Sequence, residues 1–444
     1  MTTYDVREVR LFPERLERLR GFELDFPQQG HRDRVHVLHV IGWVVGLDSR
    51  ATHIEVVYGD QVLRTAPVRG IREDVARALD VDATDCVFHL LVGLIGLDRE
   101  PTLHLRVALE DGTKVPAATI RLYRRPLKTH HRPSLRPLIV TSLGRSGSTW
   151  LMKMLAAHPE IVVFRRFPYE SAPARYWLHM LRVLSDGANL DQSTHPNYFP
   201  MDLWSIGSNP YADDRVYEQP PLAEWLAGDY VERLAAFCQQ TIDDWYRKLA
   251  EMQAQPDALY FAEKHMWPDY LAPLTWELYP AAKELFLVRD FRDMALSILA
   301  FDRQRGYAGF GRPDGVTDEQ YVRDGLGSMV RDLHEAWRTR APRAHLIRYE
   351  ALLGDPHQIL AAALRYLEVD SSPEAVGEIV QHASAETLEL PGASGESVEV
   401  NAHRTMDDPA TTIGRWRTEA DRAFLEASDS AFGEALEAFG YSAG

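Results

Sequence analysis

The chain has 444 residues, of which 45% are hydrophobic and 26% are charged. This composition is typical of a protein with a full apolar core and excludes a disordered, collagen-like or coiled-coil chain. Its 49 basic and 65 acidic residues give a formal net charge of −16, which disfavours non-specific binding to nucleic acid or to an anionic membrane surface.

Cysteine usage and hydropathy narrow the class of protein further. The two cysteines, Cys86 and Cys238, lie far apart, which excludes a disulfide scaffold and a cysteine-rich zinc module. The most apolar run, Val87 to Leu97, is too short for a membrane span. The first residues lack the basic-then-apolar form of a signal peptide. We therefore expect a cytoplasmic protein, and the sequence leaves its oligomeric state open.

The first part of the chain has the pattern of an all-β module. Residues 1–30 are of mixed character and are expected to form a short amphipathic arm. Short β-rich runs separated by turn signals then follow, at 35–43, 53–58, 61–64, 103–109 and 118–123. Such regular short strands are typical of a β-sandwich. We expect a small sandwich over residues 31–125, with Trp43 and Phe88 in its core and a helical interruption over 71–80.

The pattern changes after a basic, proline-rich stretch at 126–137, which is expected to be a linker. Short apolar strands at 138–140, 284–288 and 345–348 alternate with long helical stretches. This alternation predicts an α/β domain over 138–444, in which a parallel sheet is flanked by helices. Residues 170–255 are rich in Trp, Tyr and Pro, and we expect this insertion to recognise the substrate.

Residues 138–155 form the most informative segment. A strand leads into a Gly/Ser loop, and the loop leads into a helix that starts near Thr149. Backbone N–H groups at such a helix N-terminus form an anion-binding site. Gly144 and Gly147 have no Cβ and therefore let an anion approach the backbone closely. Arg145 adds a permanent charge. Hydroxyl donors come from Ser146, Ser148 and Thr149. The spacing differs from the Gly-x4-Gly-Lys-Ser/Thr loop of Mg²⁺-dependent nucleotide-binding proteins.

A second strand-to-helix unit carries an arginine at the carboxyl end of its strand. Arg289 follows the strand at 284–288, and Ser297 stands eight residues later in the next helix. Ligands of open α/β sheets bind at the carboxyl ends of strands, so Arg289 and Ser297 could hold one phosphate together. Arg292 and Asp293 are expected to form a local ion pair.

These two motifs resemble those of bacterial sulfotransferases that use 3′-phosphoadenylyl sulfate (PAPS). Four segments agree with the family pattern in order and spacing, from about residue 138 to 420: Arg145-Ser146-Gly147-Ser148-Thr149-Trp150, Arg289 with Ser297, Arg348-Tyr349-Glu350-Ala351-Leu352, and Gly414-Arg415-Trp416-Arg417. The resemblance implies a P-loop-like fold. It also implies that the first motif cradles the 5′-phosphosulfate, that Trp150 stacks on adenine, and that the second motif binds the 3′-phosphate.

The C-terminal segment departs from the pattern of the aryl-type members, which carry an Arg-Lys-Gly where this chain has Pro409-Ala410-Thr411. The other contact to the 3′-phosphate is therefore open between Arg404, Arg415 and Arg417.

Sulfuryl transfer requires a base for the acceptor proton. Related bacterial enzymes carry Glu-Lys-Thr, and aryl-type members Lys-x-His, where this chain has Glu263-Lys264-His265. In a strand, Glu263 and His265 share one face and Lys264 points to the other. Either Glu263 or His265 is expected to take the proton, and Lys264 could stabilise the leaving phosphate. The segment Phe167-Pro-Tyr169-Glu170 resembles the acceptor-pocket segment of bacterial members, so Tyr169 and Glu170 are expected to bind the acceptor.

The expected function is transfer of a sulfuryl group from PAPS to a hydroxyl or amine of a glycan-like or secondary-metabolite acceptor. The β-sandwich is a candidate acceptor-binding module. No metal is required, because the transferred group carries less charge than a phosphoryl group. The alternative is a P-loop-like, ATP-dependent small-molecule kinase, which would need Mg²⁺.

Overall fold

The computed structural model describes residues 2–12, 17–59, 61–81, 85–186, 219–226, 230–266, 271–384 and 409–442. The chain divides into two compact units. The first comprises Met1–His131, Tyr176–Gln240 and Pro273–Leu278, and the second comprises Arg132–Arg175, Thr241–Ala272 and Tyr279–Gly444.

The first unit contains two antiparallel sheets. A six-stranded sheet has the order β3-β1-β9-β8-β5-β6 and a three-stranded sheet has the order β2-β4-β7. The strands are β1 (Tyr4–Leu11), β2 (Leu19–Phe26), β3 (Arg32–Asp33), β4 (Val37–Gly46), β5 (Ala51–Tyr58), β6 (Gln61–Pro67), β7 (Val87–Gly93), β8 (Thr102–Leu109) and β9 (Lys114–Arg124). The helix α1 (Glu73–Leu79) lies between β6 and β7 in sequence.

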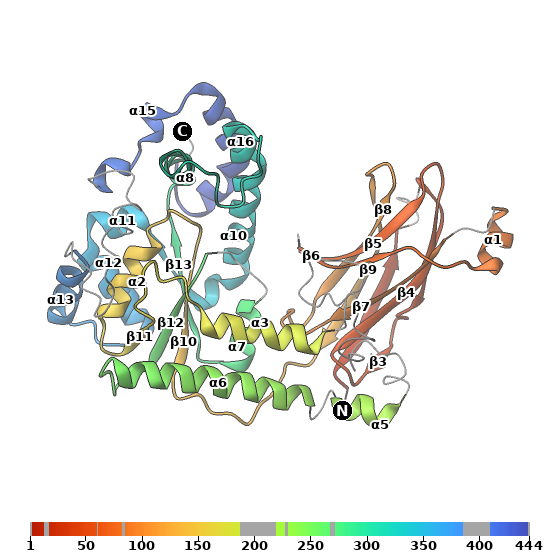
Figure 1. The fold of residues 1–444 in the computed structure, drawn as a ribbon, viewed down its shortest axis with the longest axis horizontal. Coiled ribbons are helices and arrows are strands. Elements are labelled where there is room, and N and C mark those ends of the chain that lie inside the picture. The colour runs from red at the N-terminus through yellow and green to blue at the C-terminus, as the bar shows by residue number, and fades with distance from the viewer. Residues whose placement is uncertain are drawn as a thin grey trace. The chain divides into compact units, whose positions relative to one another are not determined.

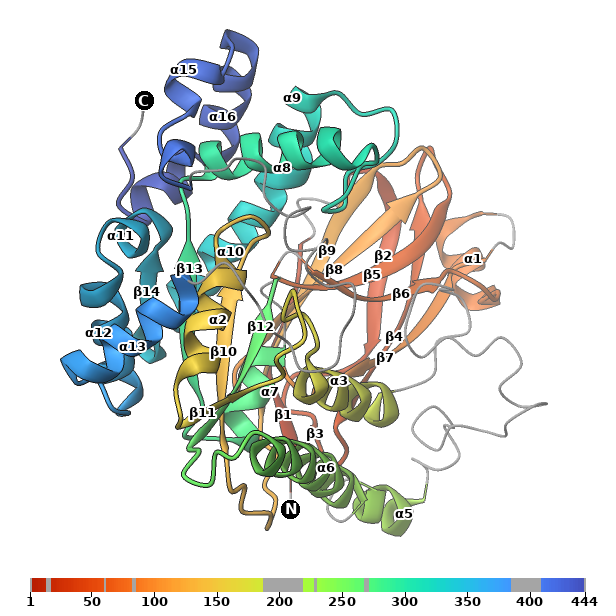
Figure 2. The same ribbon diagram turned by 60° about the vertical axis from the view of Figure 1, so that its left-hand side comes forward.

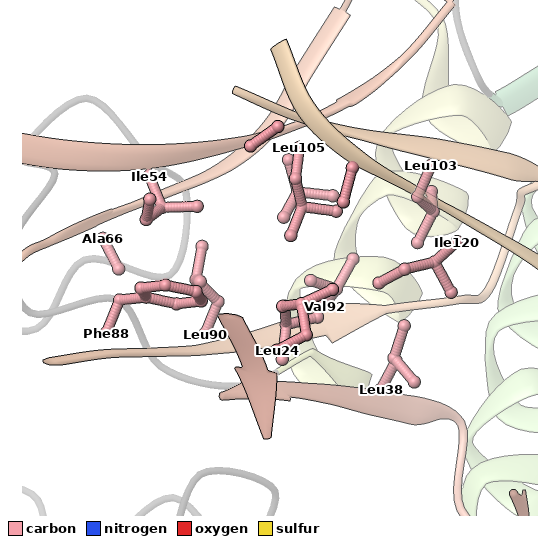
Figure 3. Packing of buried hydrophobic residues seen from close by; sticks show 14 of the residues in the cluster. Leu24, Leu38, Ile54, Ala66, Phe88, Leu90, Val92, Leu103, Leu105 and Ile120 are labelled. Carbon is pink, nitrogen blue, oxygen red and sulfur yellow. The ribbon is translucent and has the colours of Figure 1, made fainter. Parts of the chain in front are cut away.

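Alternate residues of both sheets share one hydrophobic core, which confirms the predicted sandwich. Leu38 and Phe88 of the smaller sheet meet Ile54, Leu105 and Ile120 of the larger one, as Figure 3 shows. Each such side chain contributes about 1.5–3 kcal/mol when it is fully buried, so this one layer of contacts holds the two sheets together.

Two details of this unit differ from the sequence-based expectation. Residues 1–30 are not an arm, because β1 and β2 are full members of the two sheets, with inward-facing Val6 and Leu24 in the core. Trp43 is not in the sandwich core either. It stands one residue before the inward-facing Val44 and therefore lies on the opposite face of β4, against Val75 of α1. Phe88 is a core residue, as predicted.

The second unit is built on a five-stranded sheet with the order β11-β12-β10-β13-β14. All of its neighbouring strands run parallel. The strands are β10 (Arg136–Ser142), β11 (Ile161–Val163), β12 (Tyr260–His265), β13 (Lys283–Val288) and β14 (Ala344–Arg348). The predicted α/β architecture, with a parallel sheet flanked by helices, is thus confirmed.

Helices cover both faces of this sheet (Figure 1). One face packs against α2 (Ser148–Ala157), α11 (Tyr349–Gly354), α12 (Pro356–Leu367) and α13 (Pro373–Ser384). The other packs against α8 (Phe291–Arg305), α10 (Gly327–Arg340) and α16 (Arg422–Ala438). Figure 2 shows the same strands from another side, with α2 beside β10.

The other α-helical segments of the described chain are α3 (Pro173–Ser185), α5 (Pro220–Trp225), α6 (Val231–Met252), α7 (Leu271–Leu278), α9 (Asp318–Gln320) and α15 (Trp416–Glu419). A π-helix spans Tyr321–Leu326, and 3-10 helices span Ala341–Arg343 and Pro409–Thr412. The insertion expected at 170–255 includes α3, α5 and α6, but 187–218 and 227–229 lie outside the described residues. Both cysteines are buried and unpaired. Among the described helices, none has the length and apolar character to cross a bilayer.

Candidate functional site

The predicted anion-binding loop joins β10 to α2. Gly147 precedes the helix in a left-handed conformation, with φ at 87°, and Arg145 has φ at 65°. The carbonyl of Gly147 accepts the N–H groups of Trp150 and Leu151 at 3.1 and 3.2 Å, which starts the helix where the sequence predicts. The first turn of α2 carries no acidic residue, so the positive end of the helix dipole is not neutralised locally.

The two glycines of this loop pack closely against aromatic rings. A Cβ atom on Gly144 would lie 2.3 Å from the ring of Phe310, and one on Gly147 would lie 2.4 Å from the ring of Tyr349. The sequence predicts that these glycines admit an anion. The structure adds a packing requirement, because any larger residue would push the loop away from the two rings. Phe310 belongs to no motif in the sequence.

The loop and the second motif meet directly. Arg289 donates from Nη1 to the backbone oxygen of Arg145 at 3.0 Å, and the Arg145 side chain donates from Nε to Ser297 Oγ at 3.2 Å. Arg289 also lies over the ring of Tyr349, with its Cζ 5.0 Å from the centroid. Ser297, which is predicted to hold a phosphate together with Arg289, thus contacts Arg145 through its hydroxyl. The two strand ends therefore form one site.

The arginines in this site are close enough to repel one another. Burial lowers the pKa of Arg145 to about 10, and the charge of Arg289 contributes to the shift. Burial also lowers the pKa of Arg289, with a further contribution from the charge of Arg415. Two buried donors, Arg289 Nε and Arg415 Nη1, have no hydrogen-bond partner within the described chain. Buried donors of this kind fit a polyanionic ligand, because an unsatisfied buried donor is costly.

The start of α8 holds the C-terminal Gly-x-Trp segment. Arg292 pairs with Asp290, with contacts of 3.0 and 2.8 Å, and lies 3.7 Å from the Trp416 ring centroid. Asp293 accepts the backbone N–H groups of Gly414 and Trp416 at 2.6 and 3.0 Å. The predicted Arg292–Asp293 ion pair is therefore wrong. Arg292 pairs with the helix-capping carboxylate of Asp290, and the Asp293 carboxylate accepts backbone N–H groups instead.

The candidates for the second contact to a phosphate now separate. Arg415 is held by Glu419 through Nε and Nη2, at 3.0 and 2.7 Å, and its charge acts on Arg289. Arg417 is exposed and lies over the Trp416 ring at 4.4 Å. Arg404 lies outside the described residues. Of the two candidates that the structure describes, Arg415 is the one whose charge acts on Arg289.

Glu263 is buried beneath the N-terminus of α3. Its carboxylate accepts the backbone N–H groups of Ala174 and Arg175 at 2.6 and 3.0 Å and the Tyr246 hydroxyl at 2.5 Å. Only 3% of Glu263 is exposed. Three donors thus occupy the carboxylate and satisfy a helix N-terminus, which leaves Glu263 little freedom to take a proton from an acceptor.

His265 and Lys264 lie on opposite faces of β12. His265 Nε2 is 3.6 Å from Glu263 Oε2. Lys264 Nζ donates to the Pro168 carbonyl at 2.9 Å and lies 3.3 Å from Glu170 Oε1. Burial lowers the pKa of Lys264, and the neighbouring Glu170 opposes that shift. The alternation of the strand therefore groups His265 with Glu263 and separates both from Lys264.

A second buried carboxylate lies on the Glu263 face of the sheet. Ile139 of β10 pairs with Glu263 on one side and Glu284 on the other. Glu284 is fully buried, accepts from Thr141 Oγ1 at 2.5 Å and from Arg340 Nη1 at 3.3 Å, and has one carboxylate oxygen without a described partner. Burial raises its pKa, against the opposing charges of Arg340 and His265. Glu284 is not among the residues that the sequence predicts for the site, although a glutamate directly before the apolar residues 285–288 was the available signal.

The remaining predicted residues are placed as follows. Tyr169, predicted to bind the acceptor, is 4% exposed and packs in the core of the second unit. Glu170 is half-exposed beside Lys264. Trp150 is partly buried against the same core. Ser146 and Ser148 are buried, and Thr149 is partly exposed.

One family model matches the chain. The model of the sulfotransferase family matches residues 137–373, more than half of the chain. No curated protein matches the chain. Similar solved structures include the sulfotransferase domain of the Synechococcus PCC 7002 olefin synthase, with 17% identity over 72% of this chain and 99% of that one and a TM-score of 0.37. Sulfotransferase STF9 from Mycobacterium avium has 16% identity over 70% and 78%, with a TM-score of 0.36. Mouse sulfotransferase SULT7A1 complexed with PAP has 13% identity over 69% and 86%, with a TM-score of 0.37.

Proposed function

The chain belongs to the sulfotransferase family, and we propose that it transfers a sulfuryl group from PAPS to a hydroxyl or amine of a small-molecule or glycan-like acceptor. The observation that carries this proposal is the meeting of two strand ends, at which Arg289 contacts the backbone of Arg145. Such a site can hold both phosphate-bearing ends of one nucleotide.

The residues of the site fit a doubly phosphorylated adenosine. The loop at 144–149 and the N-terminus of α2 would hold the 5′ end. Arg289 and Arg415, each with an unpartnered buried donor, would hold the 3′-phosphate. When bound, PAPS supplies a sulfuryl group on a phosphate leaving group. Arg145 would offset the charge that develops on that phosphate.

We assign the proton transfer to His265. Glu263 already accepts three hydrogen bonds. The described interactions of the His265 ring are its 3.6 Å approach to Glu263 and its electrostatic effect on Glu284. A positioned imidazole can take the acceptor proton as the new bond to sulfur forms. Glu263 would then offset the positive charge on His265. Lys264 faces the other way and is assigned to holding the Pro168–Glu170 segment.

Recognition of the acceptor is assigned to Glu170 and to the described part of the 170–255 insertion, with the β-sandwich as a further acceptor-binding module. The half-exposed carboxylate of Glu170 is anchored by Lys264, so it presents a fixed acceptor of hydrogen bonds. A hydroxyl-rich molecule is the ligand that such a group suits best.

The test combines binding and turnover. Titration calorimetry should detect 3′,5′-ADP binding tighter than about 1 mM, and mass spectrometry should detect sulfo-group addition when PAPS and a panel of hydroxylated acceptors are supplied. A chelator should not reduce this turnover. Mg²⁺-dependent ATP turnover with no response to PAPS would contradict the proposal and favour the kinase alternative.

A further inference from the structure

We propose that Asp293 is a positioning residue that fixes Arg415 for recognition of the 3′-phosphate. This inference rests on the proposed function and deepens it. The Asp293 carboxylate accepts the backbone N–H groups of Gly414 and Trp416. Arg415 is the residue between these two. These two hydrogen bonds, which we call the clamp, therefore hold the backbone on both sides of Arg415.

Asp293 is not needed to cap its own helix, so its carboxylate can bind the segment around Arg415. It is the third residue of α8, where an acidic side chain commonly caps its own helix. Here Asp290 performs that capping by accepting the N–H of Arg292 at 3.0 Å. Asp293 is 1% exposed, and its two oxygens each accept one N–H from a segment more than 120 residues away in sequence.

The clamped segment has a fixed shape. Gly414 adopts a left-handed conformation with φ at 71°, which allows the N–H groups at 414 and 416 to turn toward one carboxylate. Glu419 then holds Arg415 through Nε and Nη2. The remaining nitrogen, Nη1, is buried without a described partner. Backbone and side chain are thus both restrained, and one donor remains for a ligand.

Asp293 also supplies the charge that this arrangement needs. Arg415 and Arg289 lie close enough for their charges to oppose each other, and Asp293 acts electrostatically on Arg289 with the opposite sign. The Asp293 carboxylate therefore offsets part of the charge of Arg289. Asparagine has a similar size, but one of the two oxygens becomes an NH₂ donor, so it can neither accept one N–H on each terminal atom nor supply the charge.

The clamp is proposed to act on the 3′-phosphate alone, so the experiment compares a ligand that carries this phosphate with one that lacks it. Titration calorimetry would compare 3′,5′-ADP with 5′-AMP, which lacks the 3′-phosphate, in the full chain. Asp293→Asn should weaken 3′,5′-ADP binding about tenfold and leave 5′-AMP binding unchanged. Arg415→Ala should produce the same selective loss. The double variant should lose little more than either single variant, because both changes disable one interaction.

A matched control separates the clamp from general loosening of the C-terminal segment. Asp421→Asn makes the same chemical change at the cap of α16, where Asp421 accepts the N–H of Phe424, and it should leave the ratio of the two affinities at the wild-type value. Equal loss of both ligands in Asp293→Asn, or additive losses in the double variant, would overturn the inference while the proposed function stands. A wild-type protein that binds the two ligands equally would overturn the proposed function, and this inference with it.

Discussion

The guanidinium of Arg289 bridges two backbone carbonyls, those of Arg145 at 3.0 Å and Thr412 at 2.8 Å. Arg289 follows β13, and the loop containing Arg145 follows the neighbouring strand β10. One side chain therefore links the anion-binding loop to the C-terminal segment. Because both contacts are to backbone atoms, they fix the shape of the site without depending on the neighbouring side chains.

Replacement of Arg289 should therefore affect the whole nucleotide. Arg289→Ala removes a charge-assisted donor and releases the loop, so we expect affinity for 3′,5′-ADP to fall about 10- to 100-fold and affinity for 5′-AMP to fall as well. This differs from the selective loss expected for Asp293→Asn. Titration calorimetry would measure both ligands, with the exposed Arg422→Ala as the control. Unchanged binding of 3′,5′-ADP would show that Arg289 is not a ligand contact.

The assignment of the base predicts a split between binding and turnover. His265→Ala should lower kcat by about 10²–10⁴ and leave 3′,5′-ADP affinity within a factor of about two, because His265 is not among the proposed nucleotide contacts. Glu263→Gln should lower kcat less, since Glu263 acts through His265. Steady-state kinetics at saturating PAPS would measure both variants. A larger loss in Glu263→Gln would transfer the role of base to Glu263, and full activity in both would refute the assignment to this strand.

The local sequence pattern predicted two features of the site: which face of a strand a residue lies on, and which residue follows the end of a strand. The separation of Lys264 from Glu263 and His265 follows from the two-residue repeat of a strand. The location of Arg289 follows from the end of an apolar run. The partners of these residues were not predictable, because they come from distant parts of the chain. The Glu263 carboxylate accepts the N–H of Ala174, 89 residues away. Nothing in the sequence around Asp293 indicates a contact with Gly414.

The close approach of the Tyr349 ring predicts that position 147 tolerates no Cβ atom. Gly147→Ala should destabilise the protein by about 2 kcal/mol or more, through a left-handed backbone at an alanine and the displaced ring, and should weaken 3′,5′-ADP binding. Gly433→Ala is the matched control, because a Cβ at this site in α16 would meet no atom within 4 Å. It should raise stability by roughly 0.5–1 kcal/mol. Urea denaturation would measure both, and equal effects of the two substitutions would contradict the packing argument.

The buried carboxylate of Glu284 predicts a pH dependence of stability. Burial raises its folded-state pKa above the ordinary value of 4.5. Below that value both the folded and the unfolded chain carry the proton, so the stabilising contribution is complete. As the pH rises toward the folded-state pKa, the unfolded chain loses its proton first, and the free energy of unfolding falls. Glu284→Gln cannot ionise and should lack this part of the fall.

The measurement is the difference in unfolding free energy between Glu284→Gln and the wild type, from urea denaturation at several values between about pH 4 and pH 8. We expect this difference to shift in favour of the variant as the pH rises. The surface substitution Glu426→Gln provides the reference for losing one negative charge. A difference that stays constant across the range would mean that Glu284 ionises at the same pH in the folded and unfolded chain. In that case the contacts with Thr141 and Arg340 would fully offset the cost of burying the charge.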